Sequence, residues 1–177
     1  MAEKVIMTST DHVTEVLDVL SSRGLLLATW KQPDKPNAMT IGWGMIGCVW
    51  GKPIWQVLVR PSRYTYELIE REGRFSVNVM PKSLAGAVEL CGTVSGRDRD
   101  KLDEANLTVS SGEILGAPII DQSVIYYECR VLHANDFVPE AMVPDVRKGN
   151  YPSGDYHRVY WGEIKQCRVD RDALDSL

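Results

Sequence analysis

The chain has 177 residues, which is enough for one sizeable hydrophobic core and short for two. Apolar residues make up 44% of it, as in ordinary globular proteins, and the formal net charge of −4 argues against nucleic acid as a partner. No apolar run approaches the roughly 20 residues that a membrane-spanning helix needs, and the first residues lack the pattern of a signal peptide. We therefore expect a cytoplasmic protein that binds neither membrane nor nucleic acid.

The cysteines and histidines are widely scattered along the chain. No two of them lie at a spacing typical of metal ligands, so we expect no metal site. The cysteines are expected to be reduced and buried in strands or helices.

The first third of the chain predicts one helix followed by extended segments. Apolar residues at helical spacing predict a helix over 10–23, which Gly24 ends. Turn-forming residues fill 32–37. Runs of apolar and β-branched residues predict extended segments at 25–30, 39–50 and 54–59.

The rest of the chain mixes strands with short helices. Helices are predicted from Tyr64 to a stop at Gly73 and again after Ser83. Residues 135–156 contain several prolines and glycines and are predicted to form a long loop. Strands are predicted at 75–79, 124–134 and 158–168. Because helices do not alternate regularly with strands, a small antiparallel barrel is favoured over a doubly wound parallel sheet.

The segment Arg60-Pro61-Ser62-Arg63-Tyr64-Thr65 directly follows an apolar strand and begins the second predicted helix. Free N–H groups and the positive end of the helix dipole attract anions at such a position, and hydroxyl side chains add donors. Arginine suits phosphate oxygens in charge and geometry. The segment therefore predicts a site for a phosphorylated small molecule, with a basic surface turn as the alternative. Neither a dinucleotide-binding glycine motif nor a Walker motif is present.

Two further patterns are compatible with a bound cofactor. Asn37-Ala38-Met39-Thr40-Ile41-Gly42-Trp43-Gly44 combines glycines and small polar residues in an extended run, which suits close approach of a flat ring; a twisted barrel strand is the alternative. Asn78 interrupts an apolar strand, where a ligand or a neighbouring turn has to satisfy its amide. No Ser–His–Asp or Cys–His arrangement stands out, so we expect a bound cofactor to carry the chemistry.

From about residue 25 to residue 165, the ordered segments resemble the flavin reductase-like family. Asn37–Thr40 resembles its segment along the isoalloxazine ring, and Arg60–Thr65 resembles its phosphate-binding turn. Residues 75–79 resemble the next strand, and Ser95-Gly96 with Asp100-Lys101 resembles the next signature. The resemblance implies a mainly β, Greek-key-like, antiparallel FMN-binding split β-barrel with short flanking helices. It also implies a single domain over 1–177 with its core at about 20–169.

The resemblance further implies an oxidoreductase that passes electrons between a reduced nicotinamide (NADH or NADPH) or a protein donor and FMN or a further acceptor. A non-catalytic flavin-binding or electron-carrier protein is the alternative, and a homodimer is implied in either case. Cofactor-binding roles are implied for Asn37, Ala38, Met39, Thr40, Trp43, Arg60, Ser62, Arg63, Tyr64, Thr65, Asn78, Ser95 and Lys101.

One departure from the family pattern concerns the candidate catalytic residue. Many members carry Gly-Asp-His before the closing strand, whereas this chain has Gly154-Asp155-Tyr156-His157. The additional residue predicts that His157, the one candidate for a catalytic role, points in a different direction from the family's histidine.

Overall fold

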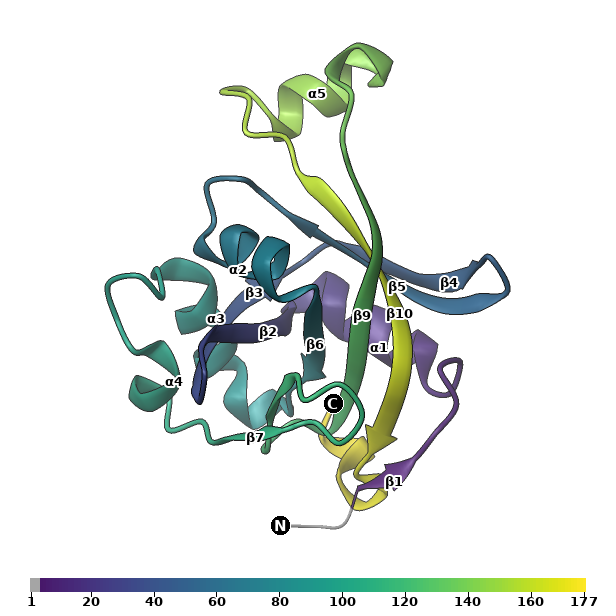
Figure 1. Cartoon of the computed structure of the whole chain (residues 1–177), viewed down its shortest axis with the longest axis vertical. Helices are drawn as coiled ribbons and strands as arrows, with labels where there is room; N and C mark the ends of the chain where they lie inside the picture. The colour runs from purple at the N-terminus through teal and green to yellow at the C-terminus, as the bar shows by residue number, and fades with distance from the viewer. Residues whose placement is uncertain (1–3) are drawn as a thin grey trace.

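An eight-stranded antiparallel sheet forms the centre of the molecule (Figure 1). The computed structural model describes residues 4–177, so the first three residues of the expected domain lie outside the described part. The strands follow one another across the sheet in the order β3 (Lys35–Ile41), β2 (Leu25–Gln32), β6 (Arg74–Val79), β9 (Ile125–Asp136), β10 (Arg158–Val169), β5 (Lys52–Val59) and β4 (Gly44–Val49). β1 (Val5–Ile6) pairs with β10. The sheet does not close, and the predicted mainly antiparallel β fold with flanking helices is confirmed.

Short helices flank the sheet, as the sequence predicts. They are α1 (Val13–Ser22), α2 (Tyr64–Glu72), α3 (Ala85–Thr93), α4 (Lys101–Glu104) and α5 (Pro144–Asn150), with 3-10 turns η1 (Lys82–Leu84), η2 (Pro139–Ala141) and η3 (Arg171–Ser176). α2 packs against β2 and α3 against β3, whereas α1 lies near β4 (Figure 1). No helix among residues 4–177 is long and apolar enough to cross a bilayer.

Two hydrophobic clusters hold these elements together. The larger one lies inside the curved sheet and includes the fully buried rings of Trp55, Phe75 and Tyr127. The smaller one joins β2 and β3 to α3 and α4, with Leu26 and Val88 at its centre. β3 contributes to both clusters, with Ile41 in the larger one and Ala38 in the smaller one. It is the strand that carries the ring-binding segment in the sequence interpretation.

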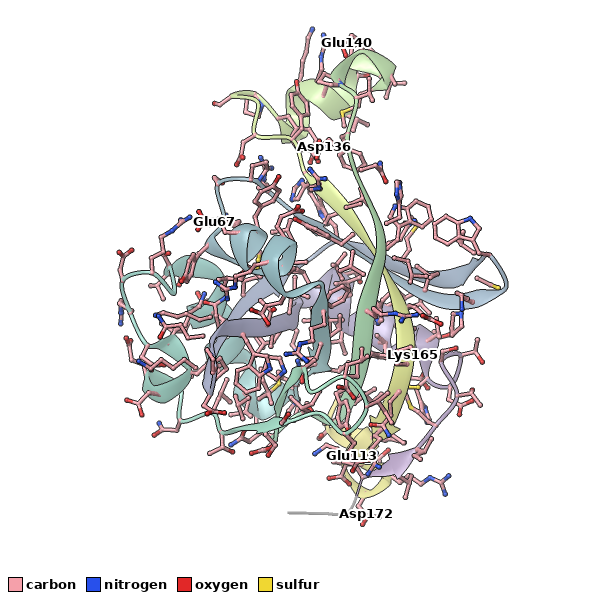
Figure 2. All side chains as sticks on the ribbon, in the orientation of Figure 1. Glu67, Glu113, Asp136, Glu140, Lys165 and Asp172 are labelled. Atoms are coloured by element: carbon pink, nitrogen blue, oxygen red, sulfur yellow. The ribbon has the colours of Figure 1, made fainter. Side chains whose placement is uncertain are left out.

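The structure corrects the prediction for residues 135–156, which are not one long loop. β9 continues to Asp136, which pairs with Arg158 of β10, and η2 and α5 follow. This segment projects from the body of the molecule, with Asp136 at its base and Glu140 near its outer end (Figures 1 and 2). The prolines and glycines suggested a loop, but Pro144 lies in the first turn of α5, where proline is well tolerated.

Three smaller predictions also need correction. The extended run predicted at 39–50, with glycine breaks at 42, 44 and 47, is interrupted only between Ile41 and Gly44, and its first strand, β3, already begins at Lys35. Cys48 is exposed on β4, whereas the other three cysteines are buried and all four are free. The sequence interpretation missed β1, η3 and the small hairpin of β7 (Val109–Ser111) and β8 (Pro118–Ile120).

Candidate functional site

A cavity of about 350 Å³ lies beside β3, at the start of α2 and the end of α3. Apart from Ala38 and Asn78, every residue implied as cofactor-binding lines it, and so does His157. Its full lining comprises Asn37, Met39, Thr40, Ile41, Gly42, Trp43, Leu58, Arg60, Ser62, Arg63, Tyr64, Thr65, Cys91, Gly92, Thr93, Val94, Ser95, Gly96, Lys101 and His157.

Helix α2 presents its first turn to this cavity. Arg63 is extended, with φ −80° and ψ 136°, and the helix begins at Tyr64. It ends at Gly73, whose φ of 62° is a conformation that glycine adopts without strain. Because the first N–H groups of a helix lack partners within the helix, this turn offers donors and a positive dipole end to an anion.

A buried hydrogen bond joins the start of α2 to β3. The Asn37 side-chain amide donates to Thr65 Oγ1 at 2.9 Å, and both residues are almost fully buried. Because Thr65 Oγ1 accepts this bond, its own hydroxyl proton remains available to a ligand. The contact therefore fixes the position of one donor on the cavity wall.

Lys101 brings a buried ammonium group to the cavity wall. Its Nζ donates to the carbonyl oxygens of Cys91 at 2.9 Å and Val94 at 3.0 Å, at the C-terminal end of α3. Burial lowers the pKa of Lys101, Cys91 opposes this shift, and the positive charge of Arg63 adds to it. An ammonium group has three donors, so two are used by the helix end and one remains for the cavity.

Arg60 and Ser62 contact the segment that precedes β10. Arg60 Nη1 donates to the Asp155 carbonyl at 3.1 Å, and Nη2 donates to the Asn150 carbonyl at 2.9 Å. Ser62 donates twice to the Asp155 carboxylate, from its backbone N–H at 3.2 Å and from Oγ at 2.6 Å. The arginine that the sequence interpretation assigned to phosphate therefore also holds this segment.

His157 lies at the far end of the cavity among aromatic side chains. Its ring centroid is 5.0 Å from that of Trp43, and its Nδ1 is hydrogen-bonded to the Tyr151 hydroxyl at 2.7 Å. Burial, followed by the positive charge of Arg60, lowers the pKa of His157 to about 4, while Asp155 opposes the shift. The imidazole is therefore neutral at neutral pH.

The charged side chains of the lining all have the same sign. Arg60, Arg63 and Lys101 contribute cationic groups, and no aspartate or glutamate is part of the lining in the described chain. This positive site belongs to a chain whose formal net charge is −4. Such local positive charge favours an anionic ligand.

Two of the implied residues point elsewhere. Ala38 is fully buried in the smaller cluster and is not part of the cavity lining. Asn78 is also fully buried, and its amide is satisfied within the protein: it donates to Leu26 O and Ser76 Oγ and accepts from Ile120 N–H. The protein itself, including β8, supplies these partners.

The sequence interpretation missed two parts of the wall. One is the end of α3, where Cys91 to Val94 line the cavity, and the other is Leu58 of β5. Gly92 was the available signal, because a Cβ there would lie 3.2 Å from Thr40 Cβ, so α3 and β3 pack closely at this point.

Comparison with known proteins identifies the family and the fold. The family model described as "Flavin reductase like domain" matches residues 20–177. The structure of flavoredoxin from Methanosarcina acetivorans is similar, with a TM-score of 0.66 and 26% identity over 96% of this chain and 77% of that one. An FMN-binding protein from Thermus thermophilus has a TM-score of 0.65 at 21% identity, covering 84% and 72% of the two chains.

Among curated proteins, the uncharacterized protein YddH of Escherichia coli (strain K12) is 30% identical over 105 residues, 59% of this chain and 55% of that protein. The chain spans about half the length of the curated relatives it matches. Since the family model covers residues 20–177, which is most of the chain, the chain belongs to the flavin reductase-like family.

Proposed function

We propose that the cavity binds FMN, with the phosphate at the start of α2 and the ring along β3. The observation that carries this proposal is the lining, in which Arg60, Arg63 and Lys101 meet a helix start without any acidic residue. The cavity volume of about 350 Å³ is within the range of small-molecule sites, which is about 300–1,000 Å³. The similar protein from Thermus thermophilus is an FMN-binding protein, which supports the choice of ligand.

In this proposal, different residues of the lining bind different parts of FMN. Arg63 and the Thr65 hydroxyl hold the phosphate. The Thr65 oxygen already accepts a hydrogen bond from Asn37, so the Thr65 hydroxyl proton is the group that is donated to the phosphate. Lys101 supplies one further donor from a position fixed by the α3 carbonyl oxygens. Bound FMN would supply the redox ring that exchanges electrons between NADH, NADPH or a protein donor and an acceptor.

A non-catalytic flavin carrier is the second candidate function. It is favoured by His157, whose Nδ1 is engaged with Tyr151 and whose lowered pKa keeps it uncharged at neutral pH. A neutral, hydrogen-bonded imidazole is a weak partner for a charged donor molecule. Reduction of bound flavin by NADH or NADPH under nitrogen distinguishes the two: bleaching by either donor supports the reductase, and its absence supports the carrier.

The phosphate assignment is tested by comparing FMN with riboflavin, which lacks the phosphate. Arg63→Ala should weaken FMN binding by about 10- to 100-fold, because one charge-assisted hydrogen bond contributes about 1.5–3 kcal/mol. Riboflavin binding should change little. Fluorescence titration of both flavins measures the two dissociation constants, with Arg147→Ala on α5 as a control that removes the same charge away from the cavity lining. An equal loss for both flavins would contradict the phosphate role.

A further inference from the structure

The Asp155 carboxylate is hydrogen-bonded to Ser62, a residue of the cavity lining that directly precedes the helix start where the proposed function puts the phosphate. Its two oxygens accept from the Ser62 N–H at 3.2 Å and the Ser62 hydroxyl at 2.6 Å, in the turn that leads into α2. These are donors of the kind that a phosphate at a helix start takes. One lining residue of the proposed phosphate site thus already binds an anionic group of this chain, from a residue that is 93 positions away in sequence and lies outside the lining.

Several contacts keep the segment around Asp155 in this position. Arg60 donates to the carbonyl oxygens of Asn150 and Asp155, and its guanidinium lies 4.9 Å from the centre of the Tyr151 ring. Gly154 and Asp155 both have positive φ values, 78° and 57°. Aspartate is one of the few residues that adopt this conformation at low cost, so the backbone here favours the residue that supplies the carboxylate.

A phosphate and the Asp155 carboxylate compete for the same two donors of Ser62. Both groups are negative, so each raises the cost of placing the other beside Ser62. A phosphorylated ligand therefore has to break two hydrogen bonds of the protein before it uses these donors. A ligand without phosphate leaves the Ser62–Asp155 contact in place.

We propose that Asp155 is an internal competitor for the phosphate site, and that it sets how strongly the chain distinguishes FMN from riboflavin. The inference rests on the proposed function and goes further, because it identifies a residue that reduces affinity instead of providing it. An affinity lowered in this way favours a flavin that exchanges with solution over one that stays bound.

The test compares Asp155→Asn with the wild type in fluorescence titrations with FMN and with riboflavin. Asparagine keeps the size of the side chain and tolerates the positive φ, so the change removes the charge with little effect on the backbone. FMN should bind at least about 10-fold more tightly to the variant. In the wild type FMN has to break the charge-assisted Ser62–Asp155 contact, and in the variant this contact is no longer charge-assisted. Riboflavin binding should be unchanged.

Two further variants make the result specific to the contact with Ser62. Asp145→Asn, at an exposed position in the first turn of α5, removes the same charge outside the cavity lining and should alter neither dissociation constant. Ser62→Ala should weaken FMN binding more in the Asp155→Asn background than in the wild type, because only there is the hydroxyl free before FMN binds. An unchanged or weakened affinity of Asp155→Asn for FMN, beside normal riboflavin binding, would overturn the proposal.

A titration with inorganic phosphate tests the competition by Asp155 independently of flavin binding. Line broadening in the ³¹P spectrum reports phosphate binding without any flavin, and Asp155→Asn should broaden the signal at lower protein concentration than the wild type. If no flavin binds to either protein, the proposed function fails, and the phosphate titration still decides the competition. Equal broadening by both proteins would then overturn it.

Discussion

Asn37 and Thr65 show how single residues connect the two walls of the cavity. Their hydrogen bond joins β3 to α2 across 28 positions of sequence. The sequence identified both residues, because each belongs to a local run with a recognisable composition. Their contact could not be predicted, since nothing in either run indicates which strand the helix meets.

Gly96 gives a test at the residue scale. A Cβ at this position would lie 2.0 Å from Asn37 Oδ1, so Gly96→Ala should displace the buried amide and break its bond to Thr65. We expect a loss of about 1–3 kcal/mol in the free energy of unfolding, measured by thermal denaturation, together with weaker flavin binding.

Gly47→Ala is the matched control for this substitution. Gly47 lies on β4 outside the cavity lining, and a Cβ there meets no atom within 4 Å. The control should keep both stability and binding. Equal behaviour of the two variants would show that the Asn37 contact is unimportant.

Asp155 illustrates the limit of prediction at this scale. The sequence interpretation noted the Gly154–His157 segment for an additional residue before the closing strand. The contact of its carboxylate with Ser62 depends on the return of the chain through β9 and α5, which no local pattern encodes.

At the scale of elements, α2 and β6 were the most predictable parts of the fold. Apolar residues at helical spacing and Gly73 defined α2, and the residues of β6 defined a strand that is buried along most of its length. β7 and β8 were missed because three residues each are too few to show a period. Their position depends instead on one buried side chain of β9.

That side chain is Glu128, which organises the segment before β8. Glu128 is fully buried, and its carboxylate accepts hydrogen bonds from the backbone N–H groups of Ile114, Leu115 and Ala117, at 3.1, 2.6 and 3.2 Å. Glu128→Gln replaces one acceptor oxygen with a donor and should cost at least about 1–3 kcal/mol in the free energy of unfolding. Hydrogen exchange at these three amides should become faster.

The exposed Glu113 provides a control on the same segment. Glu113, labelled in Figure 2, forms an ion pair with Arg168, and exposed ion pairs contribute about 0–1 kcal/mol. Glu113→Gln should therefore change stability and exchange only slightly. If Glu128→Gln behaves in the same way, the buried carboxylate does not organise this segment.

At the scale of the whole molecule, the open sheet agrees with the predicted barrel class but the projecting segment does not agree with the predicted loop. Val138, Val143 and Val146 of this segment are 57%, 63% and 48% exposed. Apolar side chains gathered on a projection are typical of a surface that associates with another chain. They support the proposal of a homodimer, which the family resemblance implies.

Light scattering coupled to size exclusion tests this proposal. We expect the wild type to elute as a dimer and Val146→Glu to shift it toward the monomer, because a charge would be buried in the interface. Ile6→Glu places the same charge at another exposed apolar position, on β1, and should leave the dimer intact. A monomeric wild type at high concentration would contradict the proposal.

The incomplete closure of the sheet has a consequence for the protein without ligand. β3 and β4 end the strand order, so β3 carries a row of backbone groups without a neighbouring strand. Such edges are templates on which foreign strands can add, and proteins usually cover them. Here α3 packs on β3 and the cavity lies beside it, lined by Leu58 from β5 near the other end of the sheet. A ligand in the cavity would lie against β3 and would add to the cover that α3 gives this edge strand.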